Sequence, residues 1–195
     1  MKPAGETSAG AITRHENKIN AHFQPMMGAL KSGNYITDLP VSGYGTFLSQ
    51  TDNMFAGLFV ASCDMRLDKL GVYIETPSEG TSVRLGVYDS CDDFVPGDLV
   101  LDAGVVDASV KGFAQIAVNL DLRRGYYYLV CLIENNCGLR YLKLAQSPLG
   151  MYTTFNAVFS GYVCEQDWGE LPLKFPGGAY AANVTKMVIG AGEQR

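Results

Sequence analysis

Charged residues are scarce in this chain of 195 residues, since Asp, Glu, Lys and Arg make up 18% of it, less than the roughly one quarter that is usual in globular proteins. The net charge is −5 at pH 7, and the longest basic cluster is the pair Arg123–Arg124. Binding to nucleic acid depends on neutralising phosphates with many Lys and Arg side chains. The composition therefore excludes nucleic acid as a partner.

Long apolar runs are also missing from the sequence. No run approaches the ~20 apolar residues that a transmembrane helix needs, and the first ten residues, MKPAGETSAG, lack the apolar region of a secretory signal peptide. The sequence thus predicts a protein without membrane insertion that is made and used without Sec export.

Cysteine is sparse and its spacing is irregular. The five cysteines are Cys63, Cys91, Cys131, Cys137 and Cys164, and they include no CxxC pair. A zinc site would need closer spacing. Cys131 and Cys137 flank a predicted hairpin turn at Asn135–Asn136, whose register would place Cys131 opposite Arg140. Reduced, partly buried thiols are therefore favoured over disulfides. We expect no cofactor.

From about residue 55 the hydrophobic pattern has a period of two, which is typical of strands. In SVRLGVYD, Val83, Leu85 and Val87 point to one face, and Arg84 and Tyr88 point to the other. The segment YYYLVCLI is apolar on both faces, which predicts a central strand. Turn residues such as Pro-Gly and Asn-Asn separate the predicted strands. Further predicted strands are KLGVYIE, FAQIAVNL, LRYLKLA and, last, NVTKMVIG.

Short strands at regular spacing, without a convincing long helix, indicate an all-β fold. We predict an antiparallel, jelly-roll-like β-sandwich over residues 46–195. Residues 1–45 lack the strand pattern and are predicted to form an N-terminal arm, with one short amphipathic helix within 11–23. The arm is expected to attach the protein to a partner through apolar residues at spacings of seven, four and three, which are Ile12, Ile19, Phe23 and Met26.

The segments DKLGVYIET, SVRLGVYDS, PGDLVLDAGVVD and LRRGYYYLVCLIEN carry a resemblance to a known domain. Residues 65–135 resemble a jelly-roll-like sandwich domain of structural proteins of tailed bacteriophages. The resemblance implies a non-enzymatic virion protein, such as a tail-fibre or tail-tip part or a capsid decoration, which assembles in the host cytoplasm. Its implied partners are other virion proteins and copies of itself. Such domains look like carbohydrate-binding modules in architecture, so the alternative is a module that binds a host cell-surface glycan.

The acidic stretch from residue 89 to residue 107 admits three interpretations. Paired carboxylates can hydrolyse glycosides, and Asp89, Asp92 and Asp93 are weak candidate ligands for calcium. Aspartates at a turn also bind nearby backbone amides. The turn interpretation is favoured, and we predict no catalytic residue. The six aspartates are Asp89, Asp92, Asp93, Asp98, Asp102 and Asp107.

The aromatic residues offer a further candidate surface. On a strand, Tyr126 and Tyr128 share one face and Tyr127 takes the other, so part of this triplet must pack inside the sandwich or against a neighbour. A core or subunit interface is therefore favoured over a sugar-stacking platform. The candidate ligand or interface aromatics are Tyr88, Tyr127 and Trp168.

Overall fold

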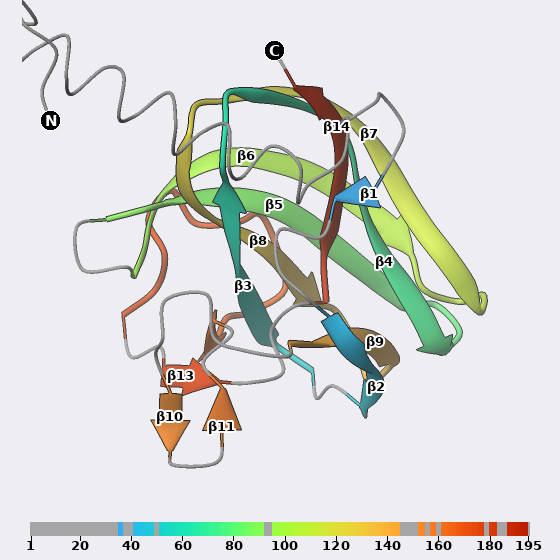
Figure 1. Cartoon of the computed structure of the whole chain (residues 1–195). Helices are drawn as coiled ribbons and strands as arrows, with labels where there is room; N and C mark the ends of the chain where they lie inside the picture. Colours follow the sequence, from blue (N-terminus) through green and yellow to red (C-terminus); the bar gives the residue numbers. More distant parts are fainter. Residues whose placement is uncertain are drawn as a thin grey trace, which may run out of the picture.

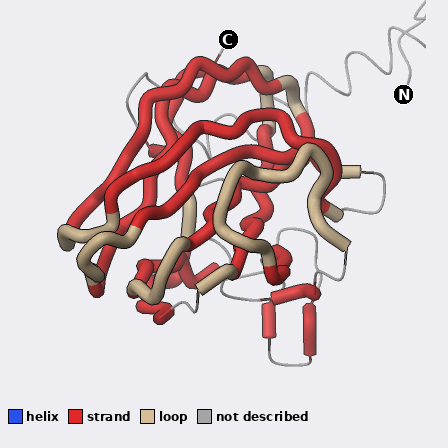
Figure 2. Tube along the Cα trace, turned by 180° about the vertical axis from the view of Figure 1, so that it is seen from behind, coloured by secondary structure: helices blue, strands red, loops and turns tan. Residues whose placement is uncertain are grey.

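The structure is a computed structural model that describes most of the chain from residue 35 onward. In this described part, strands are joined by turns and loops and no helix occurs (Figure 2), so none that could cross a membrane is found there. Two six-stranded antiparallel sheets face each other (Figure 1), which confirms the predicted all-β sandwich. The described residues are 35–36, 41–48, 51–91, 95–144, 152–154, 157–158, 161–177, 180–182 and 187–194.

The first sheet contains β1 (Tyr35–Ile36), β2 (Val41–Leu48), β4 (Met65–Thr76), β7 (Gly112–Leu122), β9 (Gly138–Leu144) and β14 (Ile189–Gln194). The long strand β4 pairs along one side with β7. Its other side pairs first with β14 and then with β9. Strand β1 extends the sheet beyond β14, and β2 extends it beyond β9. Four strands therefore run side by side in the order β7, β4, β9 and β2.

The second sheet contains β3 (Asn53–Ala61), β5 (Ser82–Ser90), β6 (Pro96–Asp107), β8 (Gly125–Ile133), β12 (Gly161–Glu165) and β13 (Tyr180–Ala182). Strand β8 lies between β3 and β5, as predicted for a segment that is apolar on both faces. A separate hairpin is formed by β10 (Tyr152–Thr154) and β11 (Ala157–Val158).

The eight strands from β2 to β9 form four nested pairs. Strand β5 pairs with β6, β4 with β7, β3 with β8, and β2 with β9. Successive pairs lie alternately in the second and the first sheet (Figure 1). This nesting is the topology of a jelly roll, in which one long antiparallel hairpin is rolled into two sheets. The predicted jelly-roll-like sandwich is confirmed.

The core between the sheets follows the period-two pattern. Leu70, Val72 and Ile74 of β4 are fully buried there, as are Val83 and Leu85 of β5. Burying one such side chain stabilises the folded state by roughly 1.5–3 kcal/mol. The alternate residues of these strands are therefore the main source of stability.

The predicted hairpin at Asn135–Asn136 is wrong. Strands β8 and β9 lie in different sheets, and Cys131 pairs with Phe55 on one side and with Leu85 on the other, not with Arg140. Because β8 already has a partner along each edge, the chain that follows it crosses to the first sheet.

The five cysteines are free thiols, as the sequence predicted. Cys131, Cys137 and Cys164 are buried, whereas Cys91 is exposed. Burial raises the pKa of all three buried thiols, to about 11 for Cys137 and Cys164. These three thiols therefore stay protonated at neutral pH.

Residues 166–177, here called the strap, cover part of the outer face of the second sheet. Trp168, Leu171 and Phe175 of the strap pack on a second apolar cluster that includes Tyr88 and Tyr128. Its backbone also bonds the edge of β6, since Leu99 N donates to Leu173 O at 2.8 Å and Phe175 N donates to Gly97 O at 2.9 Å. The second sheet is consequently buried on both faces around Tyr88 and Tyr128.

The sandwich includes residues that the sequence assigned to the arm. Strand β1 lies within the predicted arm 1–45, and β2 crosses its end. The last strand, β14, starts near the end of the predicted segment 183–190 and continues to Gln194. Residues 1–34, with the predicted helix and the candidate contacts Ile12, Ile19, Phe23 and Met26, lie outside the described residues.

Candidate functional site

Two aspartates of the acidic stretch bind backbone amides, one near the start of β6 and one in the turn that follows it. Asp89 Oδ1 accepts a hydrogen bond from Asp98 N at 2.6 Å. Asp107 accepts bonds of 2.8 Å from the amide and the hydroxyl of Ser109, and these bonds lower the pKa of its carboxyl group below the ordinary value. These contacts agree with the predicted turn role. The calcium candidates Asp92 and Asp93 lie outside the described residues.

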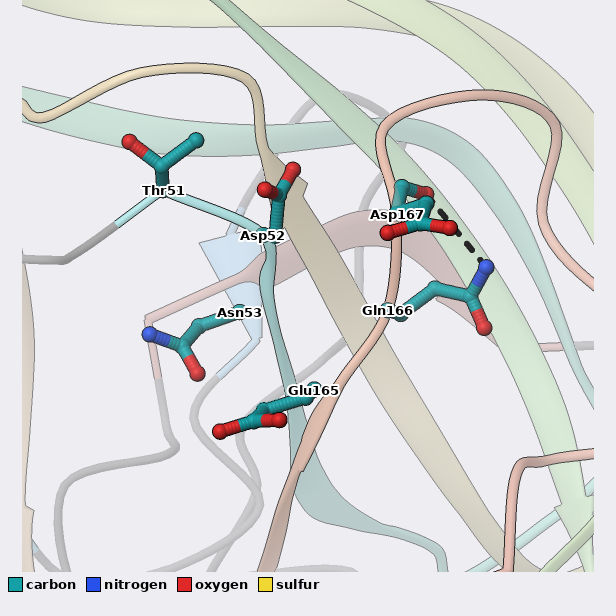
Figure 3. A pocket seen from close by; sticks show the side chains of 6 residues that line it. All are labelled: Thr51, Asp52, Asn53, Glu165, Gln166 and Asp167. Carbon is teal, nitrogen blue, oxygen red and sulfur yellow. Dashed lines mark hydrogen bonds between the residues drawn. The ribbon is translucent and has the colours of Figure 1, made fainter.

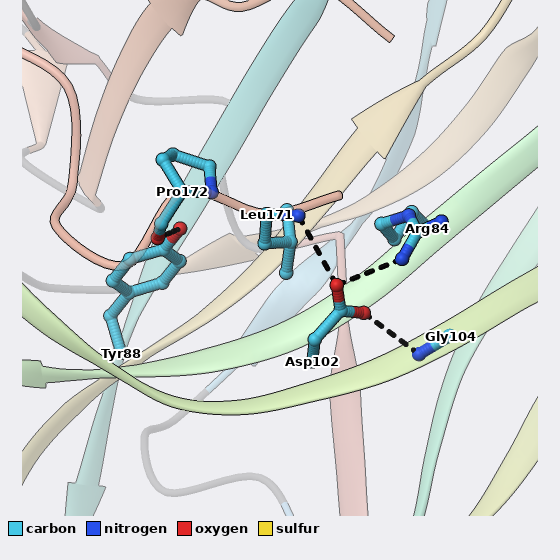
Figure 4. Close-up of polar contacts among 6 residues, drawn as sticks. All are labelled: Arg84, Tyr88, Asp102, Gly104, Leu171 and Pro172. Carbon is cyan, nitrogen blue, oxygen red and sulfur yellow. Dashed lines mark hydrogen bonds and ion pairs between the residues drawn. The ribbon is translucent and has the colours of Figure 1, made fainter. Parts of the chain in front are cut away.

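Asp102 attaches the strap to the second sheet (Figure 4). Its carboxylate accepts hydrogen bonds from Arg84 Nη1 at 2.8 Å, from Leu171 N at 3.2 Å and from Gly104 N at 3.0 Å. Arg84 and Asp102 are both about one-fifth exposed, and Arg84 also lies near the ring of Trp168. The Asp102 carboxylate thus holds the strap on β6 of the second sheet.

A polar hollow lies where β3 begins and β12 ends (Figure 3). Asp52, Glu165 and Asp167 contribute carboxylates to it, but Figure 3 shows these side chains pointing in different directions. Among the described residues no group of His, Cys, Asp and Glu is arranged to hold a metal ion. Asp52 instead supports the strap, because its Oδ1 accepts a 3.3 Å bond from Trp168 N.

The three predicted ligand or interface aromatics do not form one exposed surface. Tyr88 points outward from the core, as predicted, but the strap buries it completely, and its hydroxyl donates to Pro172 O at 2.7 Å (Figure 4). It has no surface from which to contact a ligand, so that prediction is wrong for Tyr88. Trp168 is partly buried on the same cluster, whereas Tyr127 packs against the core between the sheets. The strap is the feature that the prediction lacked.

The first sheet presents different aromatic residues on its outer face. The guanidinium carbon of Arg140 on β9 lies 3.7 Å from the ring centroid of Tyr73 on β4, and 4.3 Å from that of Tyr44 on β2. The guanidinium group therefore makes cation–π contacts with rings from both neighbouring strands. Tyr44 is 62% exposed, which is unusual for a large aromatic side chain.

Phe113 on β7 continues this row on the far side of Tyr73. The register places Phe113 directly opposite Tyr73, and its ring lies over Gly71, where a Cβ atom would come within 2.4 Å of the ring. Glycine at position 71 thus allows the ring to lie close to the sheet. Phe113 remains 39% exposed. We call Tyr44, Tyr73, Phe113 and Arg140 the aromatic–arginine face.

Glu75 binds the two cationic side chains at this face, Arg140 and Lys111. Its carboxylate accepts hydrogen bonds from Lys111 Nζ at 2.6 Å and from Arg140 Nε at 3.1 Å and Nη2 at 2.5 Å. The bonds from Lys111 and then from Arg140 lower the pKa of Glu75 below its ordinary value of 4.5. Arg140 is thereby fixed by a carboxylate at its Nε and Nη2 and by its contacts with two aromatic rings.

Sequence reasoning missed the aromatic–arginine face. Phe113 precedes an alternating strand, and Tyr73 and Arg140 stand at outward positions of KLGVYIE and LRYLKLA, so their direction could have been read from the pattern. The pattern does not show that β9 lies between β4 and β2, because those pairings join segments far apart in the chain.

Replacing Glu75 with glutamine is expected to lower the melting temperature at neutral pH, because Arg140 and Lys111 lose their anionic partner. A carboxyl group with a depressed folded pKa stabilises the protein above its unfolded pKa, and that contribution disappears as the pH falls through the folded value. The difference from wild type should therefore shrink below about pH 4.5. Thermal unfolding followed by circular dichroism between neutral pH and pH ~3 tests this.

Glu79→Gln is the matched control, because Glu79 is exposed in the turn after β4. It should leave the melting temperature nearly unchanged across the same range. A deficit of the Glu75 variant that stayed constant down to the lowest pH would contradict the ionic role of this carboxylate.

Comparison with known proteins assigns no family. No family model matches the sequence, and no curated protein matches it. A similar solved structure is the crystal structure of the cysteine protease and lectin-like domains of Cwp84, a surface layer associated protein of Clostridium difficile, with a TM-score of 0.49 and 14% sequence identity. The similarity covers 80% of this chain and 37% of that chain. At these values it implies neither a shared family nor a shared function.

Proposed function

We propose that this chain is a non-enzymatic structural protein of a tailed-bacteriophage virion, as a capsid decoration or a tail or fibre component. The proposal is supported by the sequence resemblance over residues 65–135. These residues form strands β4 to β8 and their turns, so the shared features are those that build a jelly roll. A building block needs a stable sandwich and surfaces for its neighbours, and both can be supplied without reactive groups.

The non-enzymatic part of the proposal is supported by the hydrogen bonds that the acidic stretch makes within the fold. Asp89, Asp102 and Asp107 bind backbone amides of the turns and the strap. A glycosidase would need one carboxyl group in a cleft with a raised pKa, whereas hydrogen bonds lower the pKa of Asp107. These carboxylates serve the fold.

The arm is proposed to attach the protein to other virion proteins or to copies of itself. Its apolar residues Ile12, Ile19, Phe23 and Met26 recur at spacings that suit a groove on a partner. A chain lacking residues 1–34, all of which precede β1, should fold as a sandwich but fail to join its particle. Circular dichroism would establish the fold, and co-sedimentation with particles that lack the native copy would measure incorporation.

The full-length protein is the control in that experiment. Incorporation of the shortened chain at the full-length level would show that the arm is dispensable. Absence of the full-length protein from purified particles, measured by mass spectrometry, would remove the virion assignment itself.

A second candidate function is recognition of a host cell-surface glycan. The aromatic–arginine face favours it, because exposed aromatic rings beside fixed polar groups suit a sugar, which has both apolar ring faces and hydroxyl groups. The two functions are compatible, since a fibre or tail-tip component can both build the particle and bind the host.

A further inference from the structure

The outer faces of the two sheets differ in how they are covered. On the second sheet, Trp168, Leu171 and Phe175 of the strap cover the outer face around Tyr88 and Tyr128. On the first sheet, Tyr44 and Phe113 stay 62% and 39% exposed. Exposed aromatic side chains that line up on one face mark a binding surface more often than isolated ones do.

The aromatic–arginine face is elongated. Its four side chains come from β7, β4, β9 and β2, which are hydrogen-bonded neighbours in that order. Neighbouring strands are about 4.8 Å apart, so the row extends roughly 14 Å across the sheet. A surface of this length suits a chain of several rings laid across the strands.

The polar groups of the face are fixed before any ligand arrives. Arg140 is held between the rings of Tyr44 and Tyr73, and its Nε and Nη2 bind Glu75. Neither of these bonds to Glu75 uses Nη1, so this nitrogen can donate to a ligand. Because the guanidinium group is already ordered, little side-chain entropy is lost on binding.

The charge of the face restricts the ligand further. Glu75 offsets one of the two cations, Arg140 and Lys111, which leaves a net charge of +1. One uncompensated charge on a chain with a net charge of −5 does not suit a phosphate backbone. Sugar rings, which have apolar C–H faces and hydroxyl acceptors, match the aromatic surfaces and the guanidinium donors better.

We propose that the aromatic–arginine face binds a bacterial surface oligosaccharide made of pyranose rings. Phe113 and Tyr44 stack on the apolar faces of sugar rings, and Arg140 Nη1 donates hydrogen bonds to hydroxyl oxygens between them. This inference deepens the second candidate function and rests on it. Binding is non-covalent, and the sandwich needs no rearrangement to accept the ligand.

The test uses the full-length protein on an array of bacterial O-antigen and capsular oligosaccharides, followed by titration calorimetry with the oligosaccharide that is retained. Tyr44→Ala and Phe113→Ala should each weaken binding by on the order of tenfold or more, as expected for aromatic residues central to a binding site. Arg140→Lys keeps the charge but loses the planar guanidinium group, and should also weaken it.

Tyr126→Ala is the matched control. Tyr126 is about as exposed as Phe113, but it lies on β8 of the other sheet. Its removal should therefore leave the affinity for the oligosaccharide unchanged. Circular dichroism would check that each variant folds. If Phe113→Ala were unfolded, Tyr44→Ala would decide the outcome, because its side chain is mostly exposed.

Three results would overturn the inference. In the first, the wild-type protein would retain no oligosaccharide at millimolar concentration. In the second, the Tyr44 and Phe113 variants would bind as tightly as the Tyr126 variant. In the third, both substitutions abolish self-association in sedimentation velocity, which would assign the face to a second copy of the chain. Incorporation into particles is measured separately. None of these three outcomes therefore decides the virion role, which the incorporation experiment tests.

Discussion

Replacing Asp102 with alanine is expected to lower the free energy of unfolding by about 2–4 kcal/mol. The substitution removes the acceptor for Arg84 Nη1 and for the amides of Leu171 and Gly104. Arg84 Nε already has no hydrogen-bond partner within the described residues, so the guanidinium group would lose the carboxylate that it binds while staying mostly buried. Both side chains are about one-fifth exposed, and the expected loss is therefore below that of a fully buried ion pair.

The same change should loosen the strap. Leu171 would lose its anchor, and the apolar cluster around Tyr88 and Tyr128 would open to water more often. Urea unfolding measures the loss of stability, and hydrogen exchange of the Leu171 amide reports on the strap itself.

Asp98→Ala is the matched control within the same acidic stretch. Asp98 is 67% exposed, and its carboxylate lies 3.8 Å from Lys174. Exposed ion pairs contribute about 0–1 kcal/mol, so this variant should stay close to wild type. Equal losses for the two variants would mean that the strap does not depend on the Asp102 carboxylate.

Replacing Gly192 with alanine is expected to destabilise the protein by roughly 2–4 kcal/mol. A Cβ atom at this position would lie 1.9 Å from the carbonyl oxygen of Arg66 and 3.0 Å from Leu67 Cα. These are backbone atoms of β4, which pairs with β14 around an irregularity between Ala191 and Gly192. The two strands would have to separate, and their hydrogen bonds would weaken. The midpoint of urea unfolding gives the change.

Gly169→Ala controls for the general effect of replacing glycine. A Cβ atom at position 169 would meet nothing within 4 Å, so the change should stay within about 0.5 kcal/mol. If Gly192→Ala proved equally mild, the close approach of β14 to β4 would not be needed for stability.

The strands that the sequence predicted best have a clear division between their two faces. In β7, Ala114, Ile116 and Val118 face the core while Gln115 is exposed. In the buried part of β8 neither face is polar, and this pattern indicated a central strand. Alternation is local information, because neighbouring side chains of a strand point in opposite directions whatever its partners are.

Turn residues carried less information than the strands. Asn135–Asn136 marks the end of β8 correctly, but a reversal of direction does not specify which sheet the chain joins next. That choice depends on which edges are still unpaired, and both edges of β8 are taken by β3 and β5. The paired segments are distant in the chain, so their competition leaves no local pattern.

The sequence by itself determined the fold class, the alternating core positions and the turn role of Asp89 and Asp107, because each depends on residues close together in the chain. Only the tertiary structure decided which outward-facing side chains reach the surface. Tyr88 and Tyr73 both point away from the core on predicted strands, yet the strap covers Tyr88, while Tyr73 stands beside Arg140 and Tyr44 on the open sheet. The physical reason is that exposure depends on a distant segment that packs over the sheet, and the periodicity of a strand contains no information about that segment.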